Sequence, residues 1–235
     1  PSAVVIVATV RALKLHGGAP KDQLGTEDLE ALQRGVPNLL RHADNIKNVF
    51  RLPCVVALNR FPADTVRELS LVEAACQRAA VSVVLSEVWE KGGAGGVSLA
   101  REVARLCDTE NAFSYAYDLH LPIEEKIASI VKRVYRGKGV QLLPAAKAQA
   151  ERLTALGFSG LPVCMAKTQY SFSDDPTLLG APQDFTVTVK NLRVSAGAGF
   201  IVALTGDIMT MPGLPKSPAA ARIDVDDSGR IRGLS

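Results

Sequence analysis

Residues 3–10 read AVVIVATV, an apolar run rich in β-branched residues. Such a run, without alternation of polar and apolar positions, is typical of a strand covered on both faces in a parallel sheet. Similar runs stand at residues 53–58 (PCVVAL) and 81–85 (VSVVL). We therefore predict three buried strands in the first half of the chain.

Helix signals follow each predicted strand. Residues that commonly cap helices, followed by apolar residues every three or four positions, predict helices that begin at Thr26 and at Asp64-Thr65. A third helix is predicted over residues 98–107. Pro37 is expected to break or kink the first of them. The β-α-β-α-β order implies a parallel sheet with right-handed crossovers. We assign residues 1–115 to an α/β region.

Residues 116–235 show a different pattern and are assigned to a smaller α+β region. Ile123, Ile127 and Val134 share one face of a helix whose charged residues point outward, and Pro144 suits the first turn of another that stops near Gly157. Strands are predicted at 162–166, 185–189, 200–204 and 222–225, and a Pro-Gly turn at 211–215.

The composition excludes several classes of protein. The 235 residues carry 27 Lys+Arg against 24 Asp+Glu, a net charge of +3, with 47% hydrophobic and 5% aromatic residues. This balance argues against a disordered chain and against a nucleic-acid-binding protein. No apolar run approaches the roughly 20 residues of a membrane helix, and no secretory leader is visible. We expect a cytoplasmic protein.

The four cysteines, at positions 54, 76, 107 and 164, lie far apart in apolar contexts, without a CxxC pair. The three histidines are scattered as well. We predict reduced cysteines that pack in the interior, and no metal ligands.

Ligands of open α/β sheets bind beyond the carboxyl ends of the strands, which selects residues 11–20, 59–64 and 86–96. In the first of these predicted loops, Lys14, His16 and the following glycine pair suit an anion. A solvated turn with a helix-capping glycine is the alternative. Asn59 resembles the purine-reading asparagine of P-loop proteins, although its spacing to Asp64 does not match their motif.

Aromatic residues stand in the other two loops. Phe61 and Trp89 follow successive predicted strands, so we expect their rings to face each other across a crevice. Two such faces could sandwich a flat heterocycle, a pterin or a purine, at about 1–3 kcal/mol per ring. Gly92 and Gly93 open a glycine-rich stretch before a helix, where backbone can approach an anion. The alternative is a flexible loop with Trp89 packed as a cap.

Two common motifs are absent from the sequence. It contains neither the GxxxxGK[ST] phosphate loop nor the GxSxG nucleophile elbow, and no carboxylate pair indicates a hydrolase. A buried strand pattern two residues after Pro1 is unusual, so we expect further residues upstream.

The sequence resembles the formate–tetrahydrofolate ligase family. Residues 7–18, VATVRALKLHGG, match a family signature over twelve consecutive positions. Further likenesses, in the same order as in the family, are VALNRF (56–61), WEKGG (89–93), LPVCMAKT (161–168), MTMPGLP (209–215) and the closing GL (233–234). The resemblance implies that this chain corresponds to the C-terminal two-fifths of the family's chain.

The resemblance also implies a fold and an activity. The fold would be part of a P-loop-type, mostly parallel sheet with flanking helices. The family makes 10-formyltetrahydrofolate from formate, tetrahydrofolate and ATP through formyl phosphate, with Mg²⁺ and a monovalent cation, in enzymes that are often tetramers. The partner of this chain would be the N-terminal P-loop portion of the enzyme, which would carry the catalytic residues.

The resemblance assigns site residues one by one. Phe61 and Trp89 fall on the positions whose rings sandwich the pterin, and Leu85 falls on a pocket wall. Pro62, beside Phe61, is expected in the same folate site. Possible nucleotide or anion contacts are Asn59, Lys14, His16, Gly92 and Gly93.

Two functional hypotheses remain open from the sequence. In the first, the chain is the folate-binding portion of the ligase and is inactive without the P-loop portion. In the second, the chain is a non-catalytic scaffold or regulatory fragment that binds a folate or a nucleotide, which the missing phosphate loop favours.

Overall fold

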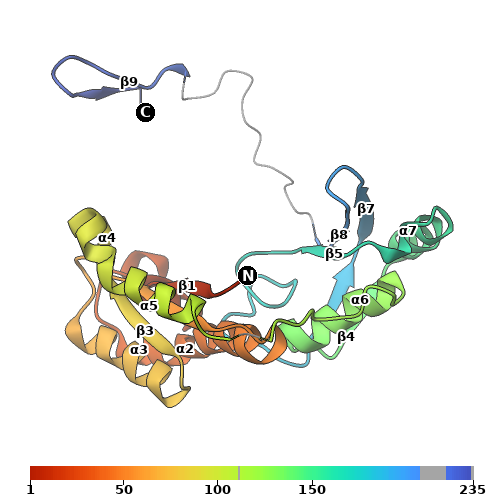
Figure 1. Cartoon of the computed structure of the whole chain (residues 1–235), viewed down its shortest axis with the longest axis horizontal. Coiled ribbons are helices and arrows are strands. Elements are labelled where there is room, and N and C mark those ends of the chain that lie inside the picture. Colours follow the sequence, from red (N-terminus) through yellow and green to blue (C-terminus); the bar gives the residue numbers. More distant parts are fainter. Residues whose placement is uncertain (111, 207–220, 234–235) are drawn as a thin grey trace.

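A computed structural model gives the fold and describes residues 1–110, 112–206 and 221–233. Its first part contains a three-stranded parallel sheet in the order β1-β2-β3, formed by β1 (Val4–Ala8), β2 (Cys54–Asn59) and β3 (Ser82–Ser86) (Figure 1). Helices flank this sheet, as the predicted α/β class requires. The predicted strands are therefore confirmed, with ends shifted by one or two residues.

Helices connect and cover the strands of this sheet. They are α1 (Val10–His16), α2 (Leu29–Asp44), α3 (Val66–Arg78), α4 (Val88–Lys91) and α5 (Val97–Cys107). Residues of α1, α2 and α3 share one hydrophobic core with Val56 and Leu58 of β2. Alternate residues of a strand face opposite sides, and Val55 and Ala57 are buried as well, while α5 contacts β2 and β3. The central strand is thus covered on both faces.

The edge strand β1 differs from its prediction. Val5 and Val7 are 39% and 68% exposed. The expectation that both faces of β1 are covered is therefore wrong. Helix α5 contacts β2 and β3, while β1 lies at the edge of the sheet beyond β2, so this face of β1 is left open to solvent.

The local capping chemistry decides where the helices begin. Thr65 and Glu68 form a capping box, which confirms the predicted start of α3. Asp28, not Thr26, caps α2 by accepting a hydrogen bond from the Ala31 N–H. Pro37 lies inside α2 without ending it, contrary to one of the two expected outcomes.

The predicted loop at residues 11–20 is wrong over its first six residues. Thr9, directly after β1, accepts a hydrogen bond from the Ala12 N–H and starts α1 without an intervening loop. Glycines then allow α1 and α2 to touch, because a Cβ at Gly17 would lie 1.7 Å from the Ala31 carbonyl oxygen. The glycine after His16 therefore serves helix packing.

The second part of the chain is mixed in structure. It contains α6 (Ile123–Ile130), the π-helical turn η4 (Val131–Tyr135), β4 (Gly139–Leu142), α7 (Pro144–Ala155), β5 (Val163–Ala166), β6 (Thr186–Val189), β7 (Asn191–Ser195) and β8 (Phe200–Leu204). Strands β4 and β6 pair in parallel, and β5, β8 and β7 form a mixed sheet. The strands β9 (Asp224–Val225) and β10 (Ile231–Arg232) form a hairpin. The predicted turn at 211–215 lies outside the described residues.

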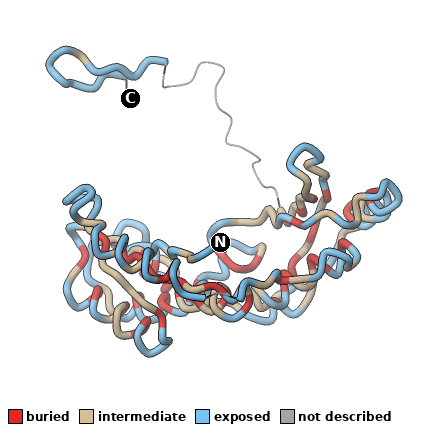
Figure 2. The backbone as a smooth tube through the Cα atoms, viewed as in Figure 1, coloured by how far each residue is buried: buried red, intermediate tan, exposed pale blue. Residues whose placement is uncertain are grey.

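Each part has a main hydrophobic core, and Figure 2 shows buried residues along both. A small third cluster in the first part consists of Ala19, Leu24 and Ala31. Side-chain hydrogen bonds join the two parts: Asn45 donates to the Val134 carbonyl at 2.9 Å, and Asn38 to the Gly180 carbonyl at 2.8 Å. A domain boundary between residues 115 and 116 stays a prediction.

The cysteines follow the prediction only in part. Cys54 and Cys76 are buried free thiols, and burial raises the pKa of Cys76 to about 11. Cys107 and Cys164 are exposed, so the expectation that they pack in the interior is wrong. Both stand where only one side of their element is covered: Cys107 ends α5, and Cys164 lies on β5 between inward-facing neighbours.

No helix within the described ranges combines the length and the apolar character that crossing a membrane would require.

Candidate functional site

The carboxyl ends of β2 and β3 bring two loops together. Asn59, the last residue of β2, pairs in register with Ser86, the last residue of β3. The Arg60 N–H continues the ladder with a 3.0 Å hydrogen bond to the Ser86 carbonyl. The segments that carry Phe61 and Trp89 therefore leave the sheet side by side.

Phe61 and Trp89 do lie against each other. Their ring centroids are 6.2 Å apart, with 50° between the ring planes. Trp89 is 63% exposed, while Phe61 is half-buried. A flat ligand in contact with both faces needs parallel rings about 7 Å apart, twice the usual carbon–carbon contact distance. The rings are thus adjacent, but they are tilted and do not face each other across a crevice as expected. They would have to rotate and separate slightly to hold such a ligand.

Asp64 fixes the loop that carries Phe61. Its carboxylate accepts a 2.8 Å hydrogen bond from the Phe61 N–H, and its own N–H donates to the Phe61 carbonyl at 3.0 Å. The side chain is buried, and burial raises the pKa of Asp64. Sequence analysis placed Asp64 at a helix start and missed this second role; its spacing of three residues after Phe61 is the signal of a tight turn. Pro62 is exposed in this turn.

The loop that carries Trp89 contains the short helix α4 and the 3₁₀ turn η3 (Gly92–Gly96). Gly92 has φ +56°, a conformation that suits glycine and not other residues. A Cβ at Gly95 would lie 2.4 Å from the Glu87 carbonyl carbon, so this glycine permits the chain to fold back on itself. Gly93 is exposed beside them. The glycine-rich stretch is thus a built turn that leads into α5.

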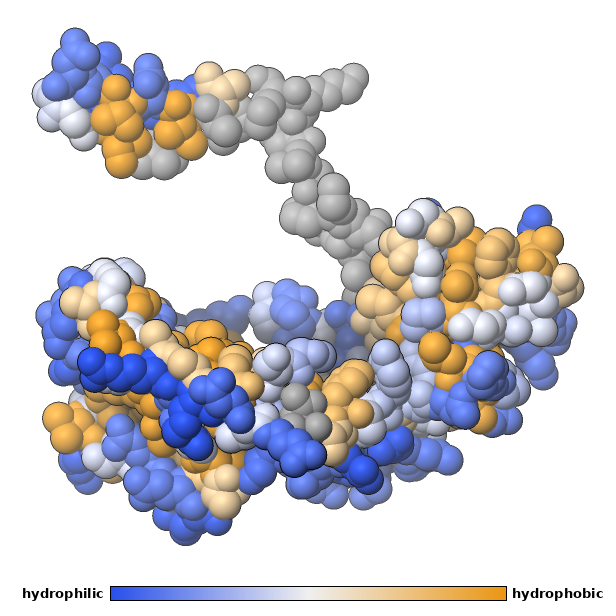
Figure 3. All heavy atoms as spheres, viewed as in Figure 1, coloured by the Kyte–Doolittle hydropathy of each residue, from blue (hydrophilic) through white to orange (hydrophobic). Residues whose placement is uncertain are grey.

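Charged residues surround the ring pair. Arg60 forms an ion pair with Glu87 at 2.9 Å, and Lys91 contacts the other oxygen of the same carboxylate at 2.6 Å. The hydrogen bond from Lys91, followed by that from Arg60, holds the pKa of Glu87 below its ordinary value. Figure 3 shows hydrophilic and hydrophobic residues intermixed on the surface over α4 and α5. Sequence analysis did not single out Arg60, Glu87 or Lys91.

Two further predicted residues, Asn59 and Leu85, lie on the strands β2 and β3. The Oδ1 of Asn59 is buried and has no hydrogen-bond partner among the described residues. A buried acceptor of this kind is able to receive an N–H from a ligand. Leu85, on β3, is half-buried and packs against the core that β2 shares with the helices.

Lys14 lies elsewhere than expected. It is buried inside α1, where its ammonium donates to Glu68 at 2.8 Å and to the Thr26 carbonyl at 2.7 Å. Glu68 also accepts from the Thr65 and Asp28 N–H groups. The expectation of an exposed loop lysine is therefore wrong, since this ammonium joins α1 to the starts of α2 and α3.

His16 lies at the contact between the two parts of the chain. Its Nδ1 accepts a 3.2 Å hydrogen bond from the Gly180 N–H. The ring lines a cavity of about 480 Å³ together with His42, Lys167 and Phe172, but without Phe61 or Trp89. The structure therefore brings Asn59, Phe61, Pro62 and the 89–93 segment together, and places Lys14 and His16 in other contacts.

A family model described as formate–tetrahydrofolate ligase matches residues 1–235. The match covers the whole sequence, including the loops that carry the two rings, and on this ground the chain belongs to the formate–tetrahydrofolate ligase family.

Proposed function

We propose that this chain supplies the tetrahydrofolate-binding site of an ATP-dependent formate–tetrahydrofolate ligase that makes 10-formyltetrahydrofolate. The carrying observation is the contact of Phe61 with Trp89 at the carboxyl ends of β2 and β3, in a chain of this family. Ligands of open α/β sheets bind at this edge.

In this proposal the two rings hold the pterin by stacking on its opposite faces. Stacking of a flat base on one aromatic ring contributes about 1–3 kcal/mol. Pro62 and Leu85 form the apolar rim, and the unpartnered Oδ1 of Asn59 receives a donor of the ligand. Held in this way, the folate would present N10 to the activated formyl group.

The phosphoryl step is not assigned to these residues. In the family, formate first attacks the γ-phosphate of ATP, and N10 of the folate then attacks the carbon of the resulting formyl phosphate. The sequence has no GxxxxGK[ST] cradle for the phosphates. We therefore propose that the N-terminal P-loop portion of the enzyme binds ATP, with Gly92 and Gly93 as the contacts that this chain could offer to an anion.

The family's ions are not assigned to this chain either. Within the described ranges, no group of three or more His, Cys, Asp or Glu side chains could hold a metal ion. We derive no step through Mg²⁺ or through a monovalent cation.

Fluorescence tests the proposed site directly, because Trp89 is the only tryptophan of the chain. Titration with tetrahydrofolate is expected to quench its emission. Phe61→Ala removes one stacking face and should weaken binding by about 5- to 150-fold, the equivalent of 1–3 kcal/mol. Tyr115→Ala, which removes an aromatic ring that is 68% exposed on the segment before α6, is the matched control and should leave the affinity unchanged. Equal affinities of Phe61→Ala and the unaltered chain would refute the sandwich.

The missing phosphate loop favours a second candidate, a non-catalytic scaffold or regulatory fragment that binds a folate or a nucleotide. An assay of ATP- and formate-dependent synthesis of 10-formyltetrahydrofolate separates the two candidates. We expect no turnover from this chain alone, and turnover once the N-terminal portion is added. Persistent inactivity with that portion present would favour the scaffold.

A further inference from the structure

The two loops that carry Phe61 and Trp89 are joined by a side-chain contact. Arg60 directly precedes Phe61, and Glu87 stands two residues before Trp89. Their side chains form an ion pair with 2.9 Å between the guanidinium nitrogen and the carboxylate oxygen. This ion pair spans the same gap between the loops as the rings do.

The Glu87 end of the pair is held firmly to the helix that carries Trp89. The Glu87 carbonyl accepts hydrogen bonds from the N–H groups of Glu90 and Lys91, at 3.1 and 2.8 Å. Its N–H donates to the Gly95 carbonyl at 3.2 Å, and its carboxylate also contacts Lys91. A displacement of Glu87 would therefore carry α4 and Trp89 with it.

The Arg60 end is held to the sheet. The Arg60 N–H donates to the Ser86 carbonyl at 3.0 Å, which continues the ladder of β2 and β3 past Asn59. The next residue, Phe61, has its N–H fixed by Asp64 at 2.8 Å. The ion pair thus connects two segments that are each held by backbone hydrogen bonds near the rings.

This arrangement limits how far the rings can separate. The centroids stand 6.2 Å apart, and a flat ligand between them needs about 7 Å and parallel planes. A small rotation of α4 can supply that change, whereas a larger opening would break the Arg60–Glu87 contact. We propose that Arg60 and Glu87 are positioning residues that keep the Phe61 and Trp89 rings close enough to hold a pterin, an inference that rests on the proposed function.

Substitution of either partner tests this inference by Trp89 fluorescence. Arg60→Met and Glu87→Gln should each raise the Kd for tetrahydrofolate by about 2- to 5-fold, the range expected for a partly exposed ion pair. The double variant, Arg60→Met with Glu87→Gln, should weaken binding no more than either single variant, because each single change already breaks the pair. Without ligand, acrylamide should quench Trp89 more strongly in both single variants, because the rings are free to part.

The sign of the two effects separates positioning from simple charge attraction. Tetrahydrofolate carries a carboxylate tail, so attraction alone would make the loss of Arg60 weaken binding and the loss of Glu87 strengthen it. Positioning predicts that both substitutions weaken binding. Tighter binding by Glu87→Gln would overturn the inference.

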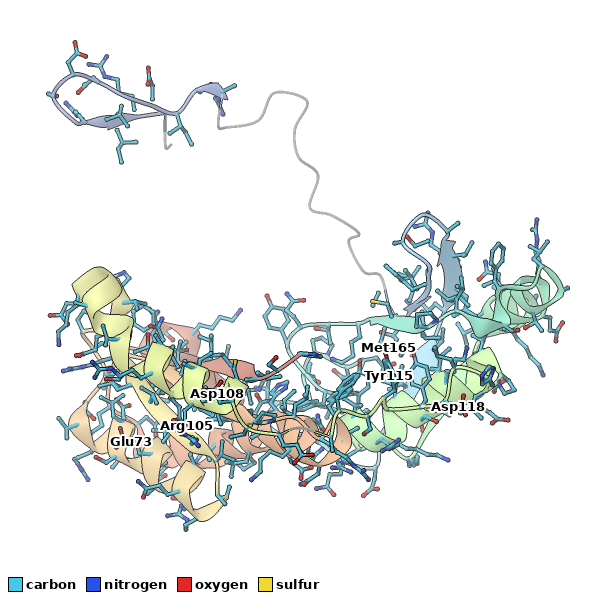
Figure 4. The ribbon with its side chains drawn as sticks, viewed as in Figure 1. Glu73, Arg105, Asp108, Tyr115, Asp118 and Met165 are labelled. Carbon is cyan, nitrogen blue, oxygen red and sulfur yellow. The ribbon has the colours of Figure 1, made fainter. Side chains whose placement is uncertain are left out.

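Arg105→Met is the matched control. Arg105 pairs with Glu102 at 2.8 Å on α5, toward the end of that helix away from α4 (Figure 4). This variant should keep the affinity and the acrylamide quenching of the unaltered chain. If the unaltered chain fails to bind tetrahydrofolate, the proposed function falls. If it binds, Phe61→Ala weakens binding, and Arg60→Met and Glu87→Gln bind with unchanged Kd, the positioning role alone is wrong.

Discussion

Gly35 shows how little space separates α1 from α2. A Cβ at this position would lie 1.8 Å from the Leu13 carbonyl oxygen and 2.9 Å from the Gly17 nitrogen, both backbone atoms. Gly35→Ala would force the two helices apart and should lower the free energy of unfolding by about 1–3 kcal/mol, the range for overpacked cores. Urea unfolding measures the loss.

Gly160→Ala is the control for this substitution, because a Cβ at Gly160 would have no heavy atom within 4 Å apart from those of Gly160 and its two chain neighbours. Its midpoint in urea should stay close to that of the unaltered chain. A similar midpoint for Gly35→Ala would mean that the close contact between the helices does not contribute to stability.

Three helical elements are tied together by one buried ion pair. Lys14 on α1 and Glu68 on α3 have side chains 1% and 0% exposed, and Glu68 also accepts the N–H of Asp28, the cap of α2. Lys14→Met leaves the buried carboxylate without its counter-charge and should cost about 3–5 kcal/mol of unfolding free energy. Lys14→Met with Glu68→Gln should cost less, since no charge is then left unpaired.

The same pair predicts a dependence of stability on pH. Burial raises the pKa of Glu68, but the hydrogen bonds from Lys14, Thr65 and Asp28 outweigh burial and hold this pKa below its ordinary value of 4.5. A carboxyl with a lowered folded pKa stabilises the fold above pH 4.5, and this contribution is lost as the pH falls through the folded pKa. Urea midpoints between pH 6 and 3 should show this loss in the unaltered chain. In Lys14→Met the contribution of Glu68 should change sign, so acid would recover stability.

The elements themselves were largely predictable from the sequence, because their signals are local. The apolar runs marked β2 and β3, and the Thr65 cap marked α3. The apolar run at residues 3–10 did not show where α1 begins. The strand ends at Ala8 and the helix begins at Val10, so only Thr9 separates them. Local signals thus located the elements better than their ends.

The candidate site was predictable only where it depends on strand order. Successive parallel strands end at one edge, and this places Phe61 beside Trp89. The ion pair between Lys14 and Glu68, 54 residues apart in sequence, depends on how α1 meets α3 and has no local signal. The sequence therefore predicted that Lys14 could bind an anion, whereas tertiary packing buries Lys14 against Glu68.

Two histidines, His16 and His42, lie at the contact between the two parts of the molecule. Their surroundings favour the neutral form of both rings. His16 accepts a hydrogen bond from the Gly180 N–H through Nδ1, and His42 packs on Phe172 with ring centroids 4.5 Å apart. Burial lowers the pKa of both rings, and for His42 the charges of His16, Lys167 and Arg41 lower it further. Protonation of either ring would therefore weaken the contact.

The sign of this effect follows from linkage. A base whose folded pKa lies below the unfolded value of 6.5 stabilises the fold fully above pH 6.5, and this contribution declines as the pH falls from 6.5 through the folded pKa. The unaltered chain should thus unfold at lower urea concentration at pH 5.5 than at pH 7.5. His16→Gln with His42→Gln should show a smaller difference between the two pH values, because neither glutamine takes up a proton. His120→Gln, which alters an exposed histidine on the segment before α6, should keep the full difference. An equal pH dependence in all three proteins would show that protonation at this contact does not control how the two parts hold together.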